Sequence, residues 1–359
     1  MFDIFNYKKL EKLILSYNKI ERINGENSKK VDCKELKVLK LNYNSLKDIN
    51  GFFENVKFEK LQLLDLDSNA IEKIDGFQKA NFKELKELIL SSNRITDISV
   101  LSKIKLEKLE KLNLAFNKIS NMDILEKCNF KELKELYLNY NYNYPYNISD
   151  IKILSKFKKM EILRLDNNGI SNINSLEILN FKELKVLDLG DNSISDIKVL
   201  EKANFEKLEE LSLFRNKISN INVLKNVNFK QLKKLYLCEN QITDISVLSK
   251  VKFGKLEILS LRNNKISNIN CFEKANFFEL KCLYLSDNLI RDISVLSKVK
   301  FKKLEILNLE NNKVNYTNAF NNPNFKELKE LYLKGNCIFD LEDLHKIKFK
   351  KLEKLDLEK

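Results

Sequence analysis

One pattern, LxxLxLxxN, returns along the whole sequence. With its first residue as position 1, the fifteen copies begin at Leu10, Leu36, Leu61, Leu85, Leu109, Leu133, Met160, Leu184, Leu208, Leu232, Leu256, Leu280, Leu304, Leu328 and Leu352. Most copies are 24 residues long, and a typical one reads LKKLYLCENQITDISVLSKVKFGK. The alternating LxLxx segment predicts a short strand with one apolar face, which such a strand cannot bury alone. Stacked copies would bury these faces together, in one parallel sheet over a continuous core.

Two further positions of the repeat have a predicted structural role. Position 9 is asparagine in all fourteen complete copies. Because its amide both donates and accepts hydrogen bonds, we expect it to satisfy buried backbone groups in the turn that leaves each strand. Phenylalanine stands three residues before nearly every new copy from Phe58 to Phe349, with Leu106 as the exception among regular copies. These rings are expected to form a spine inside the outer wall.

Charge alternates at position 2. Odd copies carry glutamate there and even copies carry lysine, with Gln62 as the one neutral residue. Neighbouring strands of a sheet lie about 4.8 Å apart, so each glutamate is expected to lie between lysines of the adjacent copies. Such a ladder favours the correct register, since a slip by one copy would bring like charges together.

The repeat resembles the leucine-rich repeat family over essentially the whole chain. Its NxIxxIxxL half is similar to the short-repeat subclass that includes internalins and the leucine-rich regulator of type-1 protein phosphatase. The resemblance implies an α/β fold: a right-handed curved solenoid of about fifteen 24-residue repeats, with a parallel sheet on the concave wall. Segments such as DISVLSK are expected to form short 3-10 or α turns on the convex wall, with Asp244 or Asp292 as an N-cap.

We interpret residues 1–359 as a single leucine-rich repeat domain. Residues 1–9 correspond to half of a preceding repeat, regular repeats follow from residue 10, and residues 142–147 form a loop insertion. The insertion carries Tyr142, Tyr144 and Tyr146 and replaces a turn that is one residue long in ordinary copies. We hypothesise that it is a partner-binding protrusion beside the concave wall, stiffened by Pro145. The alternative is that the rings fold back and cover the shortened outer wall.

The composition argues against an enzyme and against a membrane protein. His345 is the one histidine, the seven glycines form no phosphate-binding motif, and the six cysteines are scattered. We therefore expect no catalytic residues, no metal and no cofactor. The scattered cysteines fit free thiols, and no segment resembles a secretory signal or a membrane span, so a cytoplasmic location is expected.

The basic charge does not point to a concave nucleic-acid groove. The net charge is +13, yet position 2 is balanced and positions 3, 5, 7 and 8 sum to about −4 over the fifteen copies. The basic excess must therefore lie on the turns and the convex wall. There it could bind polyanions weakly, or serve only solubility.

Apolar and aromatic residues recur on the predicted concave wall. Position 5 is tyrosine in alternate copies, at Tyr137, Tyr236, Tyr284 and Tyr332, with Asp188 interrupting the series, and position 3 carries Ile258 and Ile306 among others. Exposed residues of these types are typical of an interaction hot spot, although duplication of an LYL segment would produce the same series. The sequence thus favours a non-catalytic scaffold that binds a protein or peptide. A regulatory subunit of a phosphatase or other signalling enzyme and a structural spacer are the alternatives, and neither the partner nor the oligomeric state follows from the sequence.

Overall fold

The structure, a computed structural model, describes residues 9–23, 31–119, 121–141, 151–321, 324–339 and 349–358. The chain divides into two compact units, residues 1–170 and 171–359. His345 and the tyrosine-rich insertion lie outside the described residues. In the described part, no helix has the length and apolar character needed to cross a membrane.

The first unit contains a parallel sheet whose strands follow one another in sequence order. Its strands are β1 (Lys12–Ile14), β3 (Val38–Lys40), β5 (Leu63–Asp65), β6 (Glu87–Ile89), β7 (Lys111–Asn113), β8 (Glu135–Tyr137) and β9 (Ile162–Arg164). Its other elements are a small parallel pair, β2 (Val31–Asp32) and β4 (Val56–Lys57), helix α1 (Asn50–Asn55), and the 3-10 helices η2 (Asp75–Lys79), η3 (Ser99–Ser102), η4 (Asp123–Lys127) and η5 (Ile151–Lys156).

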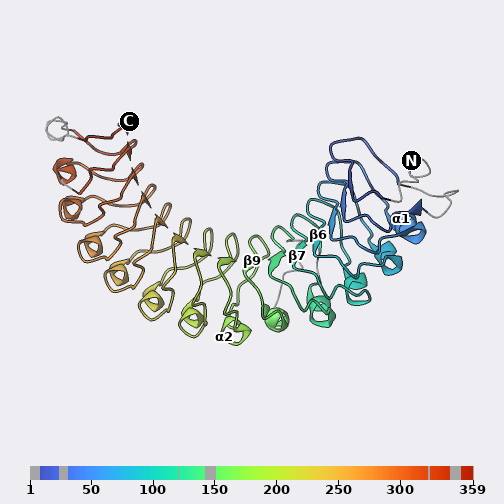
Figure 1. The fold of residues 1–359 in the computed structure, drawn as a ribbon. Coiled ribbons are helices and arrows are strands. Elements are labelled where there is room, and N and C mark those ends of the chain that lie inside the picture. The colour runs from blue at the N-terminus through green and yellow to red at the C-terminus, as the bar shows by residue number, and fades with distance from the viewer. Residues whose placement is uncertain are drawn as a thin grey trace. The chain divides into compact units, whose positions relative to one another are not determined.

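The second unit repeats this plan. Its parallel strands are β10 (Val186–Asp188), β11 (Glu210–Ser212), β12 (Lys234–Tyr236), β13 (Ile258–Ser260), β14 (Cys282–Tyr284), β15 (Ile306–Asn308), β16 (Glu330–Tyr332) and β17 (Lys354–Asp356). Its helices are α2 (Leu176–Leu179) and the 3-10 helices η6 (Lys198–Glu201), η7 (Asn222–Lys225), η8 (Ser246–Ser249), η9 (Asn270–Glu273), η10 (Ser294–Ser297) and η11 (Asn318–Phe320). Figure 1 shows the strands along one wall of each unit and the helices along the opposite wall.

The core lies between these two walls. The leucines at positions 1, 4 and 6 are buried in copy after copy, as Leu232, Leu235 and Leu237 illustrate with no exposed surface. The predicted phenylalanine spine is confirmed: Phe205 and Phe229 are buried and stack with their ring centroids 6.3 Å apart. Burial of a large apolar side chain contributes roughly 1.5–3 kcal/mol, so these positions account for most of the driving force for folding.

An aspartate lies two residues before the first residue of the short helices η8 and η10. The Oδ1 atom of Asp244 accepts a hydrogen bond from the backbone N–H of Ser246 over 2.8 Å, and Asp292 accepts one from Ser294 over the same distance. The predicted capping contact is therefore present, but the residue directly before helix η8 is Ile245. The carboxylate reaches over that residue to the first N–H of the helix, so this is an Asx turn rather than a regular N-cap.

The alternating charges form two ladders. At position 2, the Lys281 ammonium lies 2.7 Å from the Glu257 carboxylate. The Glu110 carboxylate lies between the ammonium groups of Lys134, at 2.6 Å, and Lys86, at 3.9 Å. The residue directly before position 1 forms the second ladder in the opposite phase, since copies alternate between the triplets ELK and KLE. Lys303 to Glu279 over 2.5 Å is one of its pairs. The first ladder was predicted from the sequence, and the second was not.

Candidate functional site

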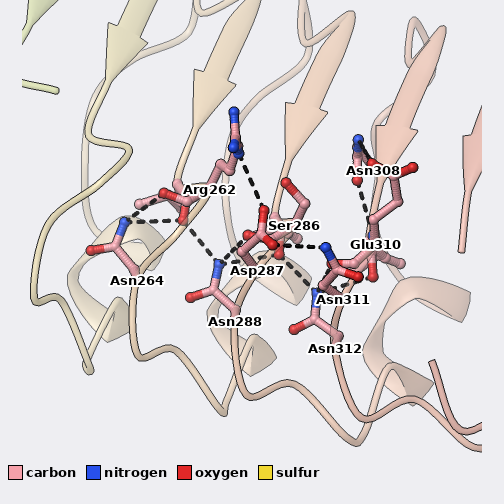
Figure 2. Close-up of polar contacts among 12 residues, drawn as sticks. Arg262, Asn264, Ser286, Asp287, Asn288, Asn308, Glu310, Asn311 and Asn312 are labelled. Atoms are coloured by element: carbon pink, nitrogen blue, oxygen red, sulfur yellow. Dashed lines mark hydrogen bonds and ion pairs between the residues drawn. The ribbon is translucent and has the colours of Figure 1, made fainter. Parts of the chain in front are cut away.

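The asparagine at position 9 connects neighbouring repeats. In Asn264, the side-chain Nδ2 donates to the carbonyls of Leu261 and Arg262 in its own turn and to that of Leu237 in the preceding repeat, over 3.0 to 3.2 Å. Its Oδ1 accepts the backbone N–H of Ile242 over 2.9 Å. Figure 2 shows the same asparagine in three successive copies, which confirms the predicted role. The turns beside the sheet are thereby held rigid, because their backbone groups are paired.

The residue directly before this asparagine has a left-handed backbone in every copy from Tyr17 to Gly335. The φ angle at position 8 lies between +47° and +67°. An L-residue pays roughly 1–2 kcal/mol for this conformation, and asparagine, aspartate and glycine tolerate it best. Sequence reasoning missed this position, although Asn263, Asp287, Asn311 and Gly335 in successive copies were a usable signal. We call the row of position-8 side chains the rim.

On the rim of the second unit, these residues form a polar network that also includes Arg262, the position-7 residue of its copy. Arg262 donates from Nε to Oδ2 of Asp287 over 3.2 Å, and Asn311 donates from Nδ2 to Oδ1 of the same carboxylate over 2.8 Å (Figure 2). Arg215 lies between Glu239, 3.0 Å from its Nε, and Asp191, 3.5 Å from its NH1. This rim is therefore charged, and its cations are paired with their neighbours.

Three of the predicted binding tyrosines form a row on the sheet of the second unit. In the register of the sheet, Tyr236 pairs with Ser260, which pairs with Tyr284. Asn308 separates Tyr284 from Tyr332 in the same way. Each ring is half-buried, whereas the Ser260 side chain between two of them is buried. Rings on alternate strands lie about 10 Å apart, with Ser260 or Asn308 on the strand between them.

An apolar strip runs beside this row at position 3. Ile258, Cys282 and Ile306 are successive partners in the register, and each is half-buried. Burial and the neighbouring Cys282 thiol raise the pKa of Tyr284 to about 12. Its hydroxyl therefore stays protonated at neutral pH and well into the alkaline range.

The charge of this wall is acidic. In the second unit, the described residues at positions 3, 5, 7 and 8 include nine acidic and five basic side chains. Arg215, Arg262, Lys234 and Lys334 form ion pairs with acidic neighbours, and the Lys354 ammonium lies 4.6 Å from the ring centroid of Tyr332. The cations are thus engaged, and the remaining charge is negative.

Tyr137 belongs to the first unit and has different neighbours. Its hydroxyl donates to Oε2 of Glu135 over 2.9 Å, and the Lys111 ammonium lies 5.2 Å from its ring centroid. Lys111 also forms an ion pair with Glu135 over 3.0 Å. Tyr142, Tyr144 and Tyr146, the tyrosines of the insertion, lie outside the described residues, so their part in a site stays a prediction.

The six cysteines are free. Burial raises the pKa of the Cys128 and Cys271 thiols to about 12, which keeps both thiols protonated and unreactive at neutral pH. Among the described residues, no group of three histidine, cysteine or carboxylate side chains is placed to hold a metal ion.

Comparison with known proteins identifies the family. The leucine rich repeat family matches residues 8–71 and 59–119, and a description of two leucine rich repeats matches residues 182–226 and 230–274. Together these matches cover more than half of the chain, and the chain belongs to the leucine-rich repeat family. No curated protein matches it by sequence.

Solved structures agree with this assignment. An internalin (inlF) from Listeria monocytogenes is 25% identical with a TM-score of 0.74, covering 98% of this chain and 88% of its own. A leucine-rich repeat protein from Leptospira interrogans is also 25% identical with a TM-score of 0.74, over 97% of this chain and 90% of its own. The Arabidopsis receptor kinase HAESA, solved with the peptide hormone IDA and the co-receptor SERK1, is 22% identical with a TM-score of 0.63, over 91% and 58%. The resemblance to internalins and the leucine-rich repeat solenoid predicted from the sequence are thus confirmed.

Proposed function

We propose that this chain is a non-catalytic interaction module that binds a protein or peptide on the sheet wall of its second unit. The observation that carries the proposal is the row of Tyr236, Tyr284 and Tyr332 on alternate strands, beside the apolar strip of Ile258 and Ile306. Half-buried tyrosines lose little conformational entropy on binding and supply a large contact area, which makes them frequent hot spots.

Two further observations support the proposal. Ser260 and Asn308 separate the rings by one strand each, so a partner side chain could contact two neighbouring rings. The same fold carries peptide ligands in other proteins, of which HAESA with its peptide hormone is one. The acidic charge of the wall favours a partner segment that is neutral or basic.

The experiment replaces Tyr236, Tyr284 and Tyr332 together with serine and compares capture of partners by the variant and the intact chain, with mass spectrometry as the readout. A protein that binds the wall should be lost from the variant, and its affinity, measured afterwards with the purified partner, should fall by at least about tenfold. Tyr316→Ser serves as the control, because Tyr316 is 61% exposed and lies away from the sheet. Equal capture by the intact chain and the triple variant, with unchanged circular dichroism, would contradict the proposal.

A further inference from the structure

The rim of the first unit differs in kind from the rim of the second. It carries Tyr17, Tyr43, Phe116 and Tyr140, which are 74%, 47%, 50% and 38% exposed. All four have φ between +55° and +58°, where an aromatic residue is disfavoured. Exposed rings on a strained backbone add little to folding, and such strain is common where a surface has another use.

These rings form two stacks. The ring centroids of Tyr17 and Tyr43 lie 4.5 Å apart with planes 6° from parallel, and those of Phe116 and Tyr140 lie 4.4 Å apart with planes 8° from parallel. The spacing is close to the separation of neighbouring strands, so each ring plane lies across the direction in which the repeats follow one another. One face of the Tyr43 ring is covered by Tyr17, and one face of the Phe116 ring is covered by Tyr140. The other face of each ring is therefore directed toward the two repeats that lie between Tyr43 and Phe116.

We call the position-8 place of each repeat a rung of the rim. Two rungs without aromatic rings, those of Ser68 and Ser92, lie between the two stacks. The backbone N–H of Tyr43 donates to the Asp67 carbonyl, that of Ser68 to Ser91, and that of Ser92 to Ala115, over 2.9 to 3.0 Å. The rungs at Ser68 and Ser92 thus follow the same ladder as the aromatic ones. Three strand spacings place the planes of Tyr43 and Phe116 about 14 Å apart, which leaves room for two flat groups at the stacking distance.

The carboxylate of Asp67 lies beside this gap. Asp67 accepts hydrogen bonds from the hydroxyls of Ser68, over 2.8 Å, and Ser91, over 2.5 Å. Asp65, two residues earlier, is only 8% exposed and has Lys40 as its register partner, and Glu87 at the start of the next strand has Lys111. These two lysines attract those carboxylates, whereas Asp67 is held by the two hydroxyls. The gap therefore combines two aromatic faces with the carboxylate of Asp67.

We propose that this gap binds an arginine-bearing segment of a partner protein, whose guanidinium groups occupy the rungs above Ser68 and Ser92. A guanidinium is planar, stacks on aromatic faces and donates several hydrogen bonds to a carboxylate, whereas an ammonium cannot stack. The rim of the second unit shows that a rung accepts this group, since the guanidinium of Arg215 occupies its own rung between Asp191 and Glu239. This site is independent of the tyrosine row on the sheet of the second unit.

The test uses two fluorescein-labelled peptides, Gly-Ser-Arg-Ser-Arg-Ser-Gly and its lysine counterpart, and measures fluorescence anisotropy with the full chain at about 0.15 M salt. The arginine peptide should bind at least several-fold more tightly than the lysine peptide. Tyr43→Asn combined with Phe116→Asn should weaken it about tenfold, as expected for two lost cation–π contacts, and Asp67→Asn should weaken it as well. Tyr17→Asn with Tyr140→Asn is the matched control, because these rings face away from the gap.

The proposal is overturned by equal binding of the two peptides, by equal effects of the two double variants, or by no binding of the arginine peptide below about 1 mM. Folding gives a separate readout. Asparagine tolerates a positive φ better than an aromatic residue, so the melting temperature of the Tyr43→Asn, Phe116→Asn variant should equal or exceed that of the intact chain. A fall of more than about 5 °C would show that the rings serve folding instead, and would also overturn it.

Discussion

Two adjacent residues of each repeat have opposite energetic roles. The asparagine at position 9 pairs backbone groups of two repeats, while the residue before it occupies a left-handed conformation that costs free energy. Position 8 is consequently where the chain can vary without harm to the core. The first unit places aromatic rings there and the second mostly polar residues, so the two rims differ in chemistry although their backbones are alike.

The asparagine can be tested at Asn216, which is 8% exposed. Its Nδ2 donates to the carbonyls of Leu189, Leu213 and Phe214, and its Oδ1 accepts the N–H of Ile194. Asn216→Leu would leave these buried groups unpaired and should cost about 1–3 kcal/mol of unfolding free energy in urea titration. Lys217→Leu, at the exposed neighbouring residue, should change little. A neutral Asn216→Leu would mean that water or backbone movement satisfies the turn.

At the scale of the element, the strands are short and the side-chain ladders supplement the backbone hydrogen bonds between them. Each strand of the sheet has three residues, so leucine burial alone leaves the pairing of one copy with the next weakly specified. The ELK and KLE triplets alternate on both sides of position 1, and a copy out of phase would face like charges. Individual exposed pairs contribute little, so the ladders matter mainly for register.

Lys281→Glu tests this ladder, because it places a third carboxylate between Glu257 and Glu305. We expect a melting temperature lower by about 2–4 °C at low salt, and a smaller difference at about 1 M salt. The hydrogen bond from Lys281 lowers the pKa of Glu257 in the folded protein. The pair therefore stabilises the fold above the ordinary glutamate pKa, and this contribution disappears as pH falls through the lowered value. Lys265→Glu, off the ladder, is the control, and an equal effect from it would refute the ladder.

At the scale of the whole molecule, the excess positive charge and the proposed interaction surface are carried by different residues. The chain carries a net charge of +13, yet the described sheet and rim positions of the second unit hold more acidic than basic residues. The positive charge lies mainly on the turns and the outer positions. A polyanion would therefore be attracted to residues other than those proposed to bind a protein partner.

Heparin chromatography examines this separation. The intact chain should be retained and should elute at moderate salt. Binding to a polyanion releases its counterions, and the free energy gained from this release falls steeply as the salt concentration rises. The triple tyrosine-to-serine variant and a variant with Arg215→Gln and Arg262→Gln should elute at nearly the same salt concentration. Earlier elution of the arginine variant by more than about 0.1 M would place the polyanion site on the acidic wall and contradict the argument.

The organisation as a single repeat domain stays a proposal at this scale. The two compact units meet in the sequence near residue 170. If the repeats form one domain, limited proteolysis of the native chain should not cut preferentially there, because the repeat pattern continues through this point without a linker. Early release of two stable fragments of about half the chain each would show two domains instead.

The sequence by itself determined the repeat, the parallel strands, the buried leucines and phenylalanines, and the asparagine hydrogen bonds. These features depend on the identity of a residue at a fixed interval, and stacking turns an interval in sequence into a neighbour in space. The same holds for the ladder at position 2. Asn264 could be assigned its role because its amide chemistry recurs at the same turn in fourteen copies.

Only the tertiary structure decided what the variable positions do. The left-handed backbone at Tyr43 and Phe116 could not be predicted from these residue types, because neither favours a positive φ. The fold imposes this conformation through the hydrogen bonds that their backbone N–H groups donate to the next repeat. The stacking of these rings depends on plane orientation, which periodicity does not encode. The half-burial of Tyr236 and Tyr284 likewise follows from the side chains on neighbouring strands. The core could be predicted from residue type, because an apolar residue at a fixed interval is buried in each repeat. The surface sites could not, because they are formed by contacts between side chains of different repeats, and these contacts depend on the geometry of stacking.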